Sequence, residues 1–253
     1  MRCLHQPARA DQDADPVQRN RRPYGGHAQR QVRDEPQQPQ RPWASRLAAG
    51  SGAVVISVAY RLAPENPFPA AFDDAYAVLH WTAEHAAELG IDPGRIAVGG
   101  HSAGAGIAAG VALRARDEQG PAIRFQLLNQ PSLDDRQETW SAQNFTDTPW
   151  FNRARATSAW GHYLDGTPAT PYAAPARATD LSGLPPAYVA SAEFCPNRDE
   201  DLAYALRLLR SGVSVELHQW PGTFHGSHAI LSAEVSQRQI AELGDVVRRA
   251  LAG

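Results

Sequence analysis

The chain has 253 residues, 43% of them hydrophobic, and a formal net charge of −3 at neutral pH. This length suffices for one α/β domain with a sizeable core, and the weak negative charge argues against nucleic acid or an anionic membrane surface as a partner. All 24 residues counted as lysine or arginine are arginine, which excludes a lysine nucleophile. The sequence has no run of about 20 apolar residues, so no membrane span is predicted. The only two cysteines, Cys3 and Cys195, favour a reducing, cytoplasmic location.

Residues 1–42 differ in composition from the rest of the chain. They are rich in arginine, glutamine and proline, and their only branched aliphatic side chains are Leu4, Val17 and Val32. Such a segment buries too little apolar surface to offset the entropy lost on ordering. We therefore expect residues 1–42 to be mostly disordered or foreign to the fold, and we place one globular domain over residues 43–253.

Within this domain, predicted strands alternate with predicted helices, which indicates a mostly parallel sheet flanked by helices. The predicted strands lie at residues 53–60, 96–98, 125–128, 186–192 and 213–217. The predicted helices lie at residues 45–49, 72–89, 105–114, 201–210 and 232–251.

A long polar insert at residues 132–170 separates two of the predicted strands. It has helical pieces but no strand pattern, which is typical of a cap or lid over a site. Its aromatic side chains either form a small core of their own or contact a ligand, and both alternatives are open. They are Trp140, Trp150, Phe151, Trp160 and Tyr163.

The stretch Gly100-His-Ser-Ala-Gly104 lies between the predicted strand at 96–98 and the helix at 105–114. The pattern Gly-x-Ser-x-Gly in this context predicts a nucleophile elbow, with Ser102 as the nucleophile. The turn is tight, so a side chain two residues before or after Ser102 is expected to collide with its neighbours. The start of the following helix favours negative charge that develops beside the serine.

A serine nucleophile needs a base that takes its proton. His225 follows the last predicted strand in a short, glycine-flanked loop, at the edge of the sheet where sites gather. We therefore expect His225 to be the base, with His228 as the alternative. His218 is expected within a strand, and the side chain of His101 is expected to point away from Ser102.

Several further stretches carry a recognisable pattern together with the elbow. They are Tyr60-Arg-Leu-Ala-Pro-Glu65, Pro67-Phe-Pro-Ala70, Leu181-Ser-Gly-Leu-Pro-Pro186, Arg198-Asp-Glu200 and Gly222-Thr-Phe-His225. In these stretches the sequence resembles the hormone-sensitive-lipase-like carboxylesterases of the α/β-hydrolase superfamily, over residues 43–253. The resemblance implies an α/β-hydrolase fold and hydrolysis of short-chain esters without metal or cofactor. Ser102 would attack the ester carbonyl, His225 would act as base and then acid, and water would cleave the acyl-enzyme.

The acid of the catalytic triad departs from the family pattern. The family's usual acid is an aspartate directly before the proline of an Asp-Pro-Leu-x-Asp-Glu run, and Cys195 stands at that position here. A neutral thiol does not stabilise an imidazolium. We expect Asp199 to reach the histidine instead, with a structural role at the start of the next helix as its alternative. Asp201 and Cys195 stay open as the acid, whereas Glu193 and Glu200 are less favoured.

The oxyanion hole departs from the family pattern as well. Relatives carry an upstream His-Gly-Gly-Gly loop whose backbone N–H groups form most of the hole, and Gly25-Gly26 is the only paired glycine upstream here. The N–H of Ala103 is then the one expected donor, and losing a donor costs about 10²- to 10³-fold in rate. The strand before that loop lies between the strand at 53–60 and the elbow strand in this superfamily. We expect this strand to be missing, because residues 1–42 offer no apolar run to form it.

The leading hypothesis is a serine carboxylesterase, impaired by loss of the oxyanion loop, that acts on a small-molecule ester. The alternatives are a non-catalytic small-molecule-binding protein of the same fold and a truncated, inactive esterase. Ser102 and His225 favour the enzyme, whereas Cys195 and the missing loop favour the alternatives. Because the superfamily often dimerises through edge elements, a homodimer is a further hypothesis.

Overall fold

The computed structural model describes residues 40–252, with side chains from residue 43 onward. The first helix, α2 (Gln40–Ser51), begins three residues before the predicted domain boundary at residue 43. The disorder expected before Gln40 and the Gly25-Gly26 pair fall outside the described residues.

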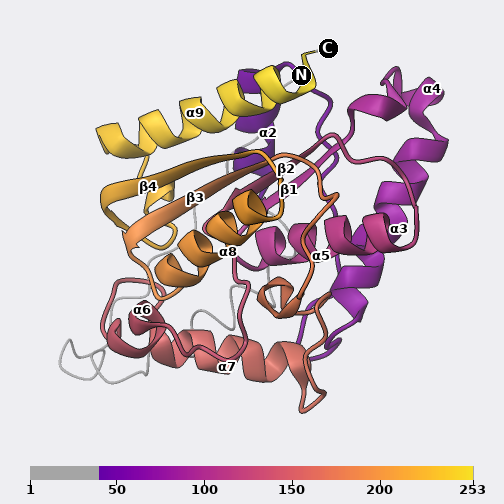
Figure 1. The fold of residues 1–253 in the computed structure, drawn as a ribbon. Coiled ribbons are helices and arrows are strands. Elements are labelled where there is room, and N and C mark those ends of the chain that lie inside the picture. Colours follow the sequence, from indigo (N-terminus) through magenta and orange to yellow (C-terminus); the bar gives the residue numbers. More distant parts are fainter. Residues whose placement is uncertain (1–39, 253) are drawn as a thin grey trace, which may run out of the picture. The chain divides into compact units, whose positions relative to one another are not determined.

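In the described part of the chain, four strands form one sheet whose order follows the chain (Figure 1). They are β1 (Ala97–His101), β2 (Phe125–Asn129), β3 (Ala187–Phe194) and β4 (Val215–Phe224). Every neighbouring pair is parallel, so the carboxyl ends of all four strands meet at one edge of the sheet. Parallel neighbours need long crossover connections, which the helices provide. The predicted α/β class with a parallel sheet is confirmed.

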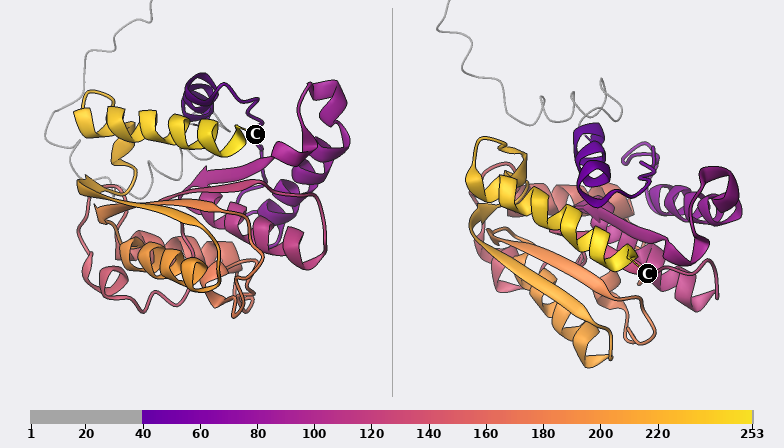
Figure 2. Two further views of the ribbon diagram at one scale, coloured as in Figure 1. Left: turned by 45° about the horizontal axis from the view of Figure 1, so that its top comes forward. Right: turned by 90° about the horizontal axis from the view of Figure 1, so that it is seen from above.

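Helices cover both faces of this sheet (Figures 1 and 2). On one face, α9 (Glu234–Leu251) packs against the strands and α2 packs against α9; on the other, α5 (Ala103–Asp117) and α8 (Arg198–Arg210) pack against the strands. The other described α-helices are α3 (Ala70–Glu84), α4 (Ala86–Leu89), α6 (Trp140–Asn144) and α7 (Arg153–Leu164). Short 3-10 helices are η2 (Pro93–Arg95), η3 (Pro175–Arg177) and η4 (Ser227–Ala229).

The strands are apolar on both sides because each side faces a helix layer. In β2, Leu127 packs in the cluster under α9 with Leu243, whereas the next residue, Leu128, packs under α5 and α8 with Leu113 and Leu208. This alternation follows from the two-residue period of a strand. Burying each leucine contributes roughly 1.5 to 3 kcal/mol, which keeps the sheet rigid beneath its carboxyl edge.

Residues 53–60 do not form a strand, so this prediction is wrong. They pair with no strand in the described part of the chain, and Val54 and Ile56 remain exposed. The β-branched composition favours a strand only where a neighbour supplies backbone hydrogen bonds and packing. Among the described residues β1 bonds to β2 alone. The expected loss of an N-terminal strand concerns residues outside the described part and stays a prediction.

Several other element boundaries differ from the prediction, among them the start of α8, which lies at Arg198 and not at Asp201. The helix expected over residues 72–89 is divided at His85 into α3 and α4. The last strand continues to Phe224 instead of ending at Leu217. It tolerates Pro221 because β4 lies at the edge of the sheet, where a missing N–H breaks no ladder.

The insert at residues 132–170 contributes α6 and α7, as its helical pieces predicted. Part of it forms a small core, in which Tyr163 packs against Trp160 and against Phe68 of the loop before α3. Among the helices between Gln40 and Leu251, none has the length and hydropathy that a bilayer crossing requires.

Candidate active site

Ser102 stands at the turn between β1 and α5, with backbone φ of 56° and ψ of −124°. A residue with a side chain adopts such a conformation only where the surrounding structure holds it there. Its N–H donates to Asn129 O at 3.0 Å, and its carbonyl accepts from the N–H groups of Gly106 at 3.1 Å and Ser132 at 3.2 Å. These bonds tie the turn to β2 and α5 and present the side chain at the carboxyl edge of the sheet.

The two glycines of the elbow differ in how tightly they are enclosed. A Cβ added to Gly100 would lie 2.5 Å from the carbonyl carbon of Gly104 and 2.7 Å from Ala105 N. A Cβ added to Gly104 would meet nothing within 4 Å. The predicted collision is therefore confirmed for Gly100 and wrong for Gly104, because the close approach involves the backbone of Gly104 and not the space beside it.

His225 follows β4 directly, and its Nε2 lies 2.8 Å from Ser102 Oγ. The loop after it turns at Gly226, where φ is 79°, and the Gly226 N–H donates to Oε1 of Gln130 at 2.8 Å. Gln130 is fully buried and was missed in the sequence. Its position directly after β2, at the carboxyl edge, is the signal that would have found it. The structure thus brings the predicted nucleophile and base together.

Cys195 occupies the third position. Its Sγ lies 3.1 Å from His225 Nδ1, in a fully buried site after β3. Burial raises the pKa of this thiol well above its usual range, and the nearby Asp201 raises it further. The group beside Nδ1 is therefore a neutral thiol at physiological pH.

Asp199 does not reach His225, in contrast to the prediction. Its Oδ2 accepts from the N–H of Ser141 at 2.8 Å, and its Oδ1 accepts from Nε of Arg198 at 2.8 Å. The reason is that α8 begins at Arg198, one residue before it, so the helix turns the carboxylate toward α6. Asp199 therefore fits the alternative of a structural role at the start of α8. Its carboxylate binds the backbone of α6, however, and does not cap α8 itself.

None of the other carboxylates considered takes the place of Cys195 beside His225 Nδ1. Glu193 accepts from the N–H of Gly222 at 2.5 Å, and Glu200 accepts from the N–H of Leu133 at 2.8 Å. Asp201 is buried beside Ser191.

Comparison with known proteins agrees with this geometry. A family model described as the alpha/beta hydrolase fold matches residues 31–229. The chain belongs to this family. Esterase LipI of Mycobacterium tuberculosis is 46% identical over 184 residues, and carboxylesterase NlhH of the same species is 43% identical over 213 residues. The solved structure of a bacterial heroin esterase superposes with a TM-score of 0.82 at 51% identity, over 85% of this chain and 70% of that one.

The chain spans only part of the length of the curated relatives that it matches. The matched part is 71% of this chain but 57% of LipI, and 80% of this chain but 66% of NlhH. The predicted fold and the resemblance to carboxylesterases of this superfamily are both confirmed by these matches.

Three imidazoles lie together in this α/β hydrolase. The ring of His101 lies 5.1 Å from that of His225 and 4.5 Å from that of His228, and His101 Nδ1 lies 3.2 Å from Asn129 O. His101 thus contacts the base. The prediction said only that its side chain points away from Ser102 and did not include this contact. Burial, with a smaller contribution from His228, lowers the pKa of His225 to about 3. The base is therefore neutral, as proton acceptance requires, but its protonated form is poorly stabilised.

Ala103 is the first residue of α5. Its N–H precedes the first hydrogen bond within the helix, so it is free to donate toward an oxygen beside Ser102. The role of Ala103 as an oxyanion donor stays a prediction. No group of three or more His, Cys, Asp and Glu side chains in residues 40–252 is arranged to hold a metal ion.

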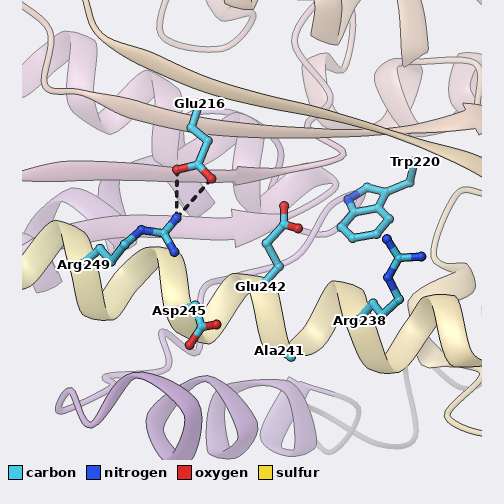
Figure 3. Close-up of a pocket in the computed structure, with 7 residues that line it drawn as sticks. All are labelled: Glu216, Trp220, Arg238, Ala241, Glu242, Asp245 and Arg249. Atoms are coloured by element: carbon cyan, nitrogen blue, oxygen red, sulfur yellow. Dashed lines mark hydrogen bonds and ion pairs between the residues drawn. The ribbon is translucent and has the colours of Figure 1, made fainter.

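A hollow of about 380 Å³ lies between β4 and α9 (Figure 3). None of the candidate site residues lines it. Glu216 and Arg249 form an ion pair at 3.0 Å there, and Glu242 accepts from the hydroxyl of Tyr188 at 2.6 Å. Its charged groups are largely paired with protein groups, so the catalytic candidate remains the Ser102 site.

Glu200 provides a prediction about stability. Burial raises its pKa from 4.5 to about 8. Between those values the folded chain binds more protons than the unfolded chain, so this group makes stability fall as pH rises across that window. Glu200→Gln keeps an oxygen that accepts from Leu133 N–H but cannot ionise. In the wild type, this group lowers the free energy of unfolding by about 1.4 kcal/mol for each pH unit within the window. We expect this decrease to be absent in Glu200→Gln, so the drop in Tm between pH 5.5 and 8 should be smaller.

The matched control is Glu193→Gln, which makes the same change at a partly exposed carboxylate. It should leave the dependence of Tm on pH as in the wild type. Parallel Tm curves for wild type and Glu200→Gln would contradict the assignment of a buried, protonated Glu200.

Proposed function

We propose that this chain hydrolyses short-chain carboxylic esters of small molecules through an acyl-enzyme on Ser102. The observation that carries this proposal is the 2.8 Å distance from His225 Nε2 to Ser102 Oγ, at a residue with positive φ between β1 and α5. The relatives named as esterases support carboxylic esters as the substrate class.

In the first half of the reaction, Ser102 Oγ attacks the ester carbonyl carbon while its proton passes to His225 Nε2. The carbonyl oxygen becomes an oxyanion, toward which Ala103 N–H donates. The protonated imidazole then gives its proton to the leaving alkoxide. An alcohol departs and the acyl group stays on the serine.

In the second half, His225 takes a proton from a water molecule, which attacks the acyl carbon. The second oxyanion collapses, the bond to Oγ breaks, and Ser102 regains its proton from the imidazolium. The products are one carboxylic acid and one alcohol. We assign the position beside Nδ1 to Cys195, which orients the imidazole without supplying a charge.

The test is hydrolysis of p-nitrophenyl acetate and butyrate by the purified protein beside Ser102→Ala. Loss of a triad serine lowers kcat by about 10⁶-fold in a fully equipped hydrolase. Here we expect a smaller loss, down to the rate of hydrolysis in buffer. The reason is that the wild-type rate is itself limited by the neutral Cys195 thiol and by the Ala103 N–H as the one expected oxyanion donor. Equal rates for the two proteins would rule the proposal out.

A second candidate function is binding of a small ester or acid without turnover. The thiol beside His225 favours it, since a neutral group there leaves the imidazolium unsupported. Retention of a butyrate ester by the wild-type protein, measured by calorimetry, without release of alcohol would favour this candidate.

We also propose a reducing, cytoplasmic location, because the buried Cys195 is a free thiol. A homodimer through the sheet edges is our proposal for assembly, supported by the open outer sides of β1 and β4 among the described strands. The molar mass in solution, measured by light scattering, decides this.

A further inference from the structure

Two neighbouring aromatic residues of the insert contact the catalytic loop. The ring centroid of Phe151 lies 4.4 Å from that of His225, with the rings tilted by 32°. The indole of Trp150 lies 5.3 Å from the ring of Phe224 in an edge-on arrangement. Other aromatic contacts made by the insert are internal or lie elsewhere: Trp160 with Tyr163, Trp140 with Phe145, and Phe145 with Phe194.

The turn that carries these two residues is fixed by its own hydrogen bonds. Thr148 Oγ1 donates to Phe151 O at 2.7 Å, and Phe151 N donates to Pro149 O at 2.7 Å. Asn152 then caps α7 by accepting from Arg155 N at 3.2 Å. A side chain held at a helix start by such bonds has little freedom to leave its contact.

Trp150 holds the same turn against the loop after the histidine. It has φ of 63°, and a Cβ placed on Gly226 would lie 3.4 Å from its indole ring. The indole therefore lies directly over the backbone of the catalytic loop. The backbone of this loop is thus bonded to Gln130 through the Gly226 N–H and is covered by the indole of Trp150 from the insert.

His225 has no charged partner to orient it. The groups that face its ring are Ser102 at Nε2, Cys195 at Nδ1, and the neighbouring imidazoles of His101 and His228. Each is neutral at physiological pH, since burial lowers the pKa of both neighbouring imidazoles and raises that of the thiol. The orientation of the base then depends on these neutral contacts and on packing, and Phe151 is the aromatic ring that the insert contributes to the packing.

We infer that Phe151 is a positioning residue for His225, which holds the imidazole toward Ser102 Oγ and keeps water from its ring, while Trp150 fixes the turn on the catalytic loop. The kinetic consequence rests on the proposed esterase function. The effect on the imidazole itself does not, because it follows from contact and burial alone.

The experiment compares Phe151→Ala and Phe151→Leu with the wild type. Phe151→Ala admits water to the imidazole, so the pKa of His225 should rise from about 3 toward 6.5. This pKa is measured by an NMR titration of the imidazole resonances. Ser102-dependent kcat for p-nitrophenyl acetate should fall by about 10- to 10²-fold, with a smaller change in KM. Phe151→Leu, which restores apolar cover, should recover most of the kcat and hold the pKa low.

Phe145→Ala is the matched control. It removes an aromatic ring from the same insert, one that packs on Trp140 and Phe194 and not on the histidine. It should leave the titration of His225 unchanged. Circular dichroism of each variant verifies that the chain is folded.

Three results separate the explanations. An unchanged titration of His225 in folded Phe151→Ala overturns the inference. Equal losses of kcat in Phe145→Ala and Phe151→Ala without a change in titration also overturn it, since they indicate general loosening of the insert. A wild type without Ser102-dependent activity removes the esterase proposal, while the titration still decides the role of Phe151.

Discussion

Replacing Cys195 with aspartate is expected to raise kcat for p-nitrophenyl acetate by up to about 10⁴-fold, the factor that a serine protease loses when the acid's role is removed. A carboxylate beside His225 Nδ1 would hold the tautomer that leaves Nε2 free to accept a proton, and it would stabilise the imidazolium. A neutral thiol also permits the opposite tautomer, in which S–H donates to Nδ1 and Nε2 cannot act as a base.

The site is prepared for an anion at this position. Backbone N–H groups of Asn197 and Arg198 act on Cys195 Sγ and favour its charged form, although burial outweighs them and keeps the pKa high. The nearby start of α8 favours negative charge as well. A carboxylate there would use these donors and the imidazolium together.

The pH profile distinguishes a restored charge from a general gain in activity. In the wild type, His225 with a pKa of about 3 stays neutral, so kcat should be flat between about pH 5 and 8. In Cys195→Asp the carboxylate raises that pKa, so an acidic limb should appear. The control is Cys195→Asn, because asparagine has the same shape as aspartate but carries no charge. An aspartate variant no faster than the asparagine variant would contradict the assignment of Cys195.

Gly100→Ala is expected to lower the free energy of unfolding by about 3 kcal/mol or to prevent folding. The added methyl would lie 2.5 Å from backbone of Gly104, and backbone at the start of a buried helix cannot move aside as a flexible side chain can. The loss is measured by urea unfolding, and esterase activity should fall with it.

Gly104→Ala is the matched control, since it adds the same methyl four residues later in open space. Its free energy of unfolding should stay within about 1 kcal/mol of the wild type, with alanine's higher helix propensity as a small gain. Similar losses in both variants would show that the elbow tolerates no side chain on either side of Ser102.

Ser102 and His225 were predictable because each lies in a local pattern that fixes its place. A strand, a tight turn and a helix position the serine, and a loop after the last strand positions the histidine. The residue beside Nδ1 was left open among Asp199, Asp201 and Cys195, with Asp199 preferred. Cys195, at the position of the family's acid, is the residue found there. The preference for Asp199 was wrong because α8 begins at Arg198 and turns that carboxylate away.

The prediction of a strand at residues 53–60 was wrong for a different reason. Composition describes how well a segment fits a sheet, but a strand also needs a neighbour whose backbone groups it can bond. Within the described residues that neighbour is absent. The aromatic residues of the insert show the same limit. Tyr163 joins a small core, as one alternative proposed, whereas Phe151 contacts the base, and contact of the insert with a ligand stays a prediction.

The position of β1 has a consequence for the dynamics of the nucleophile. Within residues 40–252, β1 is bonded to β2 alone and has an exposed Gly99, so local opening of this strand breaks fewer bonds than opening of β2 or β3. Within this part of the chain, Ser102 therefore stands at the end of a strand that is paired on one side. A strand paired on one side can accept a further extended segment through its outward N–H and C=O groups, a route to both aggregation and complementation.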